Sequence, residues 1–232
     1  MRFLIALVCC VVLIVLLAKP LKRYPVAFYI AALALVGLCW FGSTTNAAGG
    51  LWPYFMPLMQ RCALAFILFT IVMFVGVLEE GSPLRARLMP IRRQLSILGC
   101  IFALGHVAFY GVSYVPRLGS AFASNLGFSL ALATLITALM AILLVTSFQV
   151  VKHRMSASRW KGVQRLAYPF YLLTYVHLAL LLGPSALAGR DTALISIAVY
   201  SAVVGIYVVL RVRRAALRHR TQATAPQTAP SM

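Results

Sequence analysis

The chain has 232 residues, of which 62% are hydrophobic and only 10% are charged. A soluble domain usually carries about a quarter charged residues, so this composition excludes an ordinary soluble globule. The formal net charge is +18, but the basic residues stand in short clusters between long apolar runs. That arrangement is typical of the loops of a membrane protein, and it argues for anionic lipid headgroups rather than nucleic acid as the electrostatic partner.

The apolar runs predict an all-α protein, a polytopic bundle of transmembrane helices. A helix needs about 20 mainly apolar residues to cross the hydrocarbon core of a bilayer. Seven runs are candidates: 3–18, 25–42, 62–78, 94–115, 123–151, 166–184 and 192–210. The first is short and follows Arg2, as in a signal peptide. No small-x-small cleavage site precedes Lys19, however, so we expect an uncleaved span.

The basic clusters predict the orientation of these spans. They follow spans one, three, five and seven, so seven crossings place all of them on one side of the membrane. By the positive-inside rule this side is cytoplasmic, the N-terminus lies outside and the C-terminus inside. The sequence therefore predicts a multi-pass protein of the cell (plasma or inner) membrane.

Two histidines lie inside apolar spans, where an unpaired ionisable side chain is costly and points to a function. His106 and His177 each stand twelve or thirteen residues beyond the last arginine before the span. At about 1.5 Å per residue, both lie roughly 18–20 Å from the cytoplasmic boundary. Two imidazoles at one depth can ligate one metal, and bis-histidine ligation of heme iron suits electron transfer. The alternative is that each only hydrogen-bonds a neighbouring helix. The remaining pair, His153 and His219, lies in basic segments and is expected to be solvated.

Several motifs occur in an order that resembles a known family. They are Gln60-Arg61-Cys62-Ala63-Leu64, Arg92-Arg93-Gln94-Leu95, Leu104-Gly105-His106, Tyr110, Thr146-Ser147-Phe148, the segment 159–168 (RWKGVQRLAY) and His177. Together they resemble the ferric-reductase-like transmembrane superfamily, and within it the heme-binding membrane subunit of the periplasmic methionine sulfoxide reductase system. The resemblance covers roughly residues 25–210, a six-helix heme-binding core. Residues 1–24 would add an N-terminal span with a basic loop, and 211–232 a basic cytoplasmic tail that we expect to be disordered.

The resemblance implies one b-type heme with His106 and His177 as its axial ligands. No C-x-x-C-H motif is present, so covalent attachment of the heme is excluded. The two propionates of a heme need cationic partners, for which Arg61 and Arg117 are the candidates. The alternative is that both arginines only extend to the membrane interface.

The sequence departs from the family pattern at Gln164. Family members carry a histidine at this position, thirteen residues before His177. Glutamine is a poor heme ligand, so we expect a second, cytoplasmic-side heme to be absent or bound differently, with substitution by His153 left open. The single heme would then lie nearer the outer face.

The predicted function is that of a transmembrane electron-transfer subunit rather than a complete enzyme. No G-x-G-x-x-G motif follows a predicted strand, so electrons would come from a quinol or from a separate flavoprotein, with a quinone or flavin as the second redox group. The acceptor on the outer face would be an exported reductase subunit. Two alternatives remain: a ferric or cupric metal reductase subunit, and a non-redox transporter or assembly protein that kept the fold.

Overall fold

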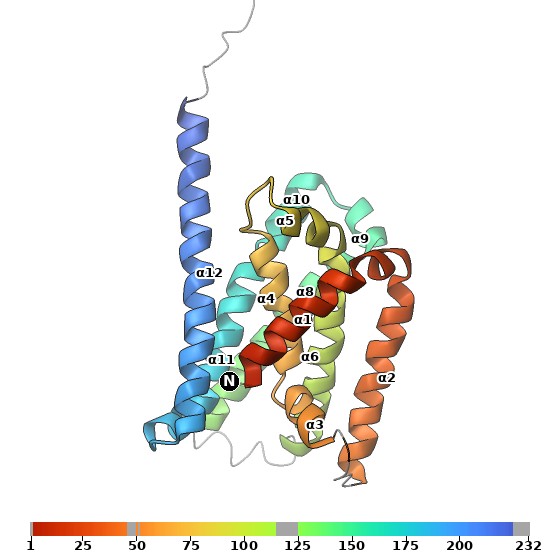
Figure 1. Ribbon diagram of the computed structural model, residues 1–232, viewed down its shortest axis with the longest axis vertical. Helices are drawn as coiled ribbons and strands as arrows, with labels where there is room; N and C mark the ends of the chain where they lie inside the picture. The colour runs from red at the N-terminus through yellow and green to blue at the C-terminus, as the bar shows by residue number, and fades with distance from the viewer. Residues whose placement is uncertain (1, 46–49, 51, 115–124, 225–232) are drawn as a thin grey trace, which may run out of the picture.

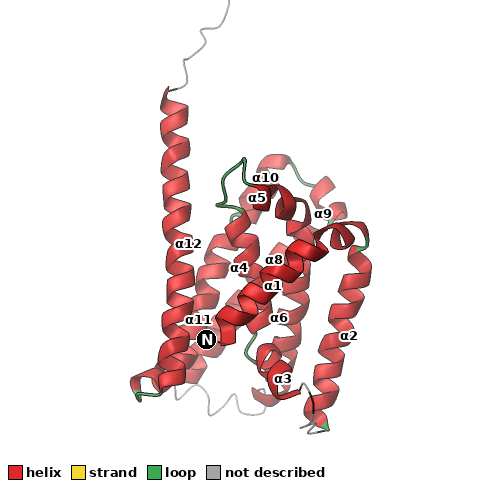
Figure 2. Cartoon of the chain, in the orientation of Figure 1, coloured by secondary structure: helices red, strands yellow, loops and turns green. Residues whose placement is uncertain are grey.

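The computed structural model describes residues 2–45, 50, 52–114 and 125–224, and within these ranges it contains helices and no strand (Figures 1 and 2). In chain order the helices are α1 (Arg2–Arg23), α2 (Pro25–Thr44), α3 (Trp52–Gln60), α4 (Ala63–Val75), α5 (Pro83–Leu88), the 3-10 helix η1 (Met89–Ile91), α6 (Arg92–Tyr114), α8 (Asn125–Ser147), α9 (Gln149–His153), α10 (Ala157–Gln164), α11 (Ala167–Leu187) and α12 (Asp191–Thr224). The prediction of an all-α, polytopic helix bundle is confirmed.

Six helical segments are long and apolar enough to cross a membrane. They are Phe3–Arg23, Pro25–Thr44, Pro83–Val112, Leu126–Ser147, Ala157–Leu187 and Asp191–Leu217. The third predicted span, 62–78, is present as the shorter apolar helix α4, whose 13 residues rise only about 20 Å. Many large apolar side chains on the outer helices are exposed, as expected for surfaces that face lipid. The chain is therefore a multi-pass membrane protein.

The helix α4 is short because the chain breaks at Cys62. The backbone of Cys62 is left-handed, with a φ of 56°, so it separates α4 from α3. The preceding helix α3 contains Pro57 and was not predicted from the sequence. This break leaves the carbonyl of Gln60 at the end of a helix, where carbonyls lack partners within the helix.

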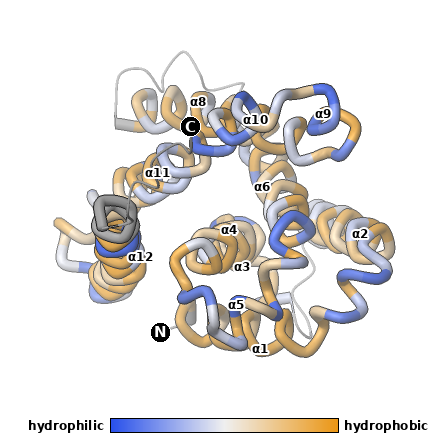
Figure 3. Tube along the Cα trace, turned by 90° about the horizontal axis from the view of Figure 1, so that it is seen from above, coloured by the Kyte–Doolittle hydropathy of each residue, from blue (hydrophilic) through white to orange (hydrophobic). Residues whose placement is uncertain are grey.

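The polar segments gather at one end of the bundle. In Figure 1 the junction of α1 and α2, the short helices α5, α9 and α10, and the far part of α12 all lie at the top, whereas α3 and the turn from α11 to α12 lie at the bottom. Figure 3, seen from that top end, shows hydrophilic segments along α5, α9 and the α1–α2 junction. All four basic clusters thus share one end, as the positive-inside orientation requires, with the N-terminal end of α1 toward the opposite side.

The helix α4 forms the centre of two hydrophobic clusters. One cluster joins it to α1, α2 and α6, and the other joins it to α6, α8, α11 and α12. The second cluster is rich in aromatic rings: Phe66 stacks on Tyr171 at 5.4 Å between centroids, and Tyr171 meets Tyr207 at 5.3 Å. The hydroxyls of Tyr171 and Thr70 hydrogen-bond at 3.0 Å inside this cluster. Through α4, the first helix becomes part of the bundle, and it slants across α4 in Figure 1.

Two glycines let α6 lie very close to its neighbours. A Cβ at Gly99 would lie 2.8 Å from Cε1 of Phe69 on α4. A Cβ at Gly105 would lie 2.7 Å from Cγ1 of Val36 on α2. Both distances are shorter than a real Cβ contact, so any larger residue would force the neighbouring side chain or helix to move. The close approach at Gly105 sets the position of α6 next to His106.

The C-terminal segment differs from its prediction over residues 211–224. These residues were expected in a disordered tail, but they continue α12 without a break. Extending a helix that already exists is cheap, and Arg, Ala and Leu, which dominate this segment, are strong helix formers. The rest of the predicted tail, 225–232, lies outside the described residues.

Candidate functional site

The ring of His106 is tethered to the end of α3. Its Nδ1 lies 2.7 Å from the carbonyl oxygen of Gln60. A carbonyl can only accept, so Nδ1 carries the proton and donates it in this hydrogen bond. The helix break at Cys62 makes this carbonyl available. The Nε2 atom of His106 is then unprotonated, and its lone pair is the one that can ligate a metal.

The ring of His177 is held in the same tautomer by α8. Its Nδ1 lies 3.1 Å from the backbone carbonyl oxygen of Ser129 and 3.1 Å from the Ser129 hydroxyl oxygen. The carbonyl again accepts, so Nδ1 carries the proton and Nε2 keeps its lone pair. Ser129 is only 2% exposed, so this acceptor is shielded from competing water.

The two histidines come from α6 and α11 and lie within electrostatic reach of each other. With a rise of about 1.5 Å per residue, His106 lies about 21 Å along α6 from Arg92, and His177 about 15 Å along α11 from Ala167. Both are half-buried in the apolar part of their spans. The structure therefore brings this predicted pair to one region of the bundle.

The donor set fits an iron porphyrin better than a bare metal ion. Across the ranges that the structure describes, no group of three or more His, Cys, Asp and Glu side chains could hold a metal. A structural zinc site needs about four protein ligands. A heme iron needs only two axial ligands, because the macrocycle supplies the rest. Metal-bound histidines also donate their other ring N–H to a carbonyl, a carboxylate or water, as both imidazoles do here.

Of the two arginines predicted to pair with heme propionates, the structure describes only Arg61. Arg61 is exposed in the turn between α3 and α4, directly after Gln60. It lies within electrostatic reach of Tyr110 and Tyr200. Tyr110 in turn packs on the His106 ring with 4.8 Å between centroids, so Arg61 lies at the edge of the histidine region. Arg117 lies outside the described residues.

Gln164, which stands where the family pattern has a histidine, makes a hydrogen bond to α8. Its Nε2 donates to the hydroxyl oxygen of Thr146 over 3.0 Å. The indole Nε1 of Trp160 donates to the backbone carbonyl of the same threonine, also over 3.0 Å. Together the two bonds fasten α10 to the end of α8. His153 is exposed on α9. It is the histidine that was left open as a substitute ligand for a second heme.

The two groups that orient the histidines were not predicted from the sequence. Gln60 acts through its backbone carbonyl, whose availability depends on a helix break that its side chain does not signal. Ser129 offered one signal, because it is a polar residue within an apolar run that is buried in the bundle. Its partner could not be read from the sequence.

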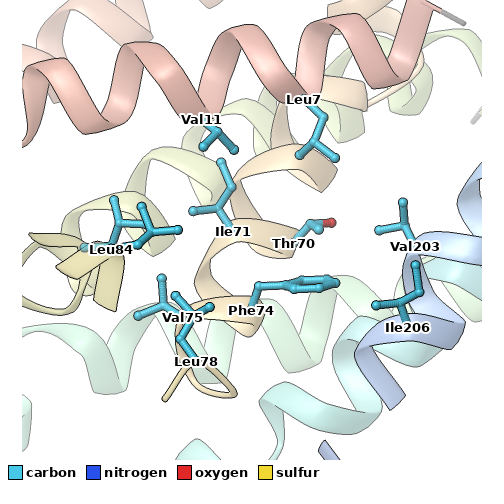
Figure 4. A pocket seen from close by; sticks show the side chains of 11 residues that line it. Leu7, Val11, Thr70, Ile71, Phe74, Val75, Leu78, Leu84, Val203 and Ile206 are labelled. Atoms are coloured by element: carbon cyan, nitrogen blue, oxygen red, sulfur yellow. The ribbon is translucent and has the colours of Figure 1, made fainter. Parts of the chain in front are cut away.

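A cavity of about 340 Å³ lies away from the histidines, between α1, α4, α5 and α12. Figure 4 shows side chains from these helices around it, among them Leu7, Phe74 and Ile206. Apart from Thr70, its lining residues are all apolar, and neither histidine is among them. This space can take hydrocarbon, but it offers no ligand for a metal.

Comparison with known proteins agrees with this arrangement. Residues 61–175 match the family of ferric reductase like transmembrane components. The match begins at Arg61, includes α4, α6 and α8, and ends two residues before His177. The chain is therefore similar to a ferric reductase like transmembrane component over just under half of its length.

A relative from a bacterium extends the similarity beyond this core. The chain is 39% identical over 222 residues to an uncharacterized protein of Treponema pallidum (strain Nichols). The alignment covers 93% of this chain but 61% of the relative, so the chain spans about three fifths of that protein's length.

Proposed function

We propose that this protein is a transmembrane electron-transfer subunit that holds one b-type heme between α6 and α11, with His106 and His177 as axial ligands. One observation carries the proposal: both Nδ1–H groups are bound to backbone carbonyls, which leaves both Nε2 atoms for iron. Imidazoles fixed in this tautomer at membrane depth are suited to axial ligation. The similarity of residues 61–175 to ferric reductase like transmembrane components supports the same function.

The residues of the chain have separate roles in this proposal. The Gln60 carbonyl and Ser129 orient the two rings. Arg61 pairs with a propionate at the outer edge, as we also propose for Arg117. The heme supplies one-electron chemistry when it is bound, and the apolar side chains of the surrounding helices keep water away from it.

We propose that electrons arrive from a quinol or a flavin donor and leave to an acceptor on the outer face, such as an exported reductase subunit. The position of the histidine site supports the outward direction, because His106 is tied to α3 at the end of the bundle opposite the basic clusters. The hydrogen bond of Gln164 to Thr146 supports a single heme, because that amide is already occupied in fastening α10.

The visible spectrum of the purified protein tests the heme. The wild type, expressed with added heme, should show a Soret band that shifts on reduction with dithionite. His106→Ala and His177→Ala should each abolish the band, because each removes an axial ligand. His153→Ala is the matched control, since it makes the same substitution at an exposed histidine, and it should leave the band unchanged. A colourless wild type, or loss of the band in His153→Ala alone, contradicts the proposal.

Ser129→Ala tests the orientation of the ring of His177. The variant keeps the backbone carbonyl but loses the hydroxyl beside Nδ1, so heme should remain bound while its reduction potential shifts. Ser196→Ala is the control, because the hydroxyl of Ser196 bonds only a carbonyl of its own helix, that of Thr192 at 2.6 Å. Equal potentials in the two variants would show that Ser129 does not act on the heme.

A further inference from the structure

A second cavity, of about 190 Å³, lies at the cytoplasmic end of the bundle. It opens where α4, α5, α6, α11 and α12 meet. Three arginines line it, Arg85, Arg92 and Arg211, together with Tyr168 and Tyr207. All three arginines are at least half-buried, and the side chain of Arg85 is only 16% exposed. The cavity does not involve either histidine of the proposed heme site.

Three guanidinium groups line the cavity, and those of Arg92 and Arg211 have no carboxylate beside them among the described lining residues. Arg92 lies within electrostatic reach of Arg211. Its Nε donates to the backbone carbonyl of Val72 over 3.2 Å, which adds no negative charge. The guanidinium of Arg211 lies 4.6 Å from the ring centroid of Tyr168. No carboxylate belongs to the described residues that line the cavity.

The nearby carboxylate of Glu80 does not line this cavity but pairs with one of its arginines and with an arginine beyond it. It bridges Arg85 at 3.3 Å and Arg214 at 2.8 Å, and its own side chain is 74% exposed. It therefore neutralises Arg85 in part, and it is not among the residues that line the cavity with Arg92 and Arg211. Clustered cations in a partly buried site are costly unless an anion pairs with them. The cavity thus has the charge of an anion site.

We propose that this cavity binds the phosphate group of an anionic phospholipid of the cytoplasmic leaflet. The planar guanidinium fork matches phosphate oxygens in a bidentate manner, and the tyrosine hydroxyls can donate further hydrogen bonds. The cavity lies at the level where the apolar spans give way to the basic loops, which is the depth of the lipid headgroups. The proposal does not depend on the heme.

The apolar cavity next to it favours a lipid over a free phosphate. Both cavities have walls from α4 and α12: Phe74 and Ile206 line the apolar one, and Met73 and Tyr207 line the basic one. Phe74 of the apolar cavity and Tyr207 of the basic cavity are in ring contact, with 5.8 Å between their centroids. An acyl chain can occupy the cavity of Figure 4 while the headgroup binds the arginines. The bound lipid would then link α12 to α5 and α6.

Native mass spectrometry of the full chain, released from nanodiscs, tests the proposal. Nanodiscs of phosphatidylcholine alone are compared with nanodiscs that also contain phosphatidylglycerol. The wild type should retain phosphatidylglycerol preferentially. Arg211→Gln and Arg92→Gln should each weaken retention by about tenfold or more, because each removes a charged hydrogen bond to phosphate. Arg213→Gln is the matched control, since Arg213 is exposed on the same helix as Arg211.

Further variants and a competition experiment distinguish a phospholipid headgroup from free inorganic phosphate as the ligand. Arg211→Lys keeps the charge and should retain more lipid than Arg211→Gln, which distinguishes a lost contact from a misfolded variant. Inorganic phosphate, added at the concentration of the lipid, should not displace phosphatidylglycerol from the wild type. Complete displacement by inorganic phosphate would overturn the lipid assignment. Equal retention in Arg211→Gln and Arg213→Gln would overturn the site itself.

Discussion

The close contact of α6 with α2 leads to a prediction for Gly105→Ala. The new Cβ would lie 2.7 Å from Cγ1 and 3.0 Å from Cγ2 of Val36. Carbon atoms pack best at about 3.5–4.0 Å, so the helices must separate or Val36 must leave its rotamer. A valine in a helix has one strongly preferred rotamer, so neither change is free. Overpacking of this kind costs about 1–3 kcal/mol.

The gain in helix propensity offsets part of this cost. Replacing glycine by alanine inside a helix stabilises it by about 1 kcal/mol. The net effect of Gly105→Ala is therefore a destabilisation of about 0–2 kcal/mol. Gly111→Ala is a matched control on the same helix, because nothing lies within 4 Å of a Cβ built there. Gly111→Ala should show the gain alone, so the two variants should differ by about 1–3 kcal/mol.

The assay is unfolding in mixed micelles, followed by circular dichroism as a denaturing detergent is titrated. Gly105→Ala should unfold at a lower fraction of the denaturing detergent than Gly111→Ala. Adding Val36→Ala to Gly105→Ala should recover most of the difference, because it removes both clashing methyl groups. If Gly105→Ala is as stable as Gly111→Ala, or if Val36→Ala brings no recovery, the close contact between α2 and α6 is not the cause.

Three further substitutions test separate contacts, each by the same unfolding assay. Tyr171→Phe leaves the buried hydroxyl of Thr70 without its partner and should cost about 1–3 kcal/mol, whereas Tyr24→Phe at an exposed position should change little. Gln164→Leu removes the bond that fastens α10 to α8 and should cost about 1 kcal/mol while leaving the proposed heme band unchanged. A hydrogen bond from Arg85, the charge of Arg85 and then Arg214 hold the pKa of Glu80 below its ordinary value. The carboxylate therefore stabilises the fold above the unfolded-state pKa, and this stabilisation is lost as the pH falls through the lowered pKa. The wild type should therefore be more stable than Glu80→Gln at neutral pH and equal to it in strong acid; a difference that persists in acid would contradict the ion-pair explanation.

The sequence by itself determined the architecture, because the bilayer imposes a local rule. A backbone in lipid must satisfy its own hydrogen bonds, so each long apolar run becomes a helix whatever its neighbours are. The basic clusters predicted which helix ends lie on the same side of the membrane, and in the structure these clusters lie at one end of the bundle. The same reasoning singled out His106 and His177, because an ionisable side chain in an apolar run is conspicuous.

Only the tertiary structure decided what these histidines contact. The acceptor of His106 lies 46 residues away at a helix break, and that of His177 lies 48 residues away on α8. The three-arginine cavity likewise combines side chains from α5, α6 and α12. Hydropathy reports how each segment meets lipid, but it carries no information about which faces of different helices pack together. These contacts depend on close packing, such as that at Gly105, and on the left-handed turn at Cys62, and both become visible only when the bundle is assembled.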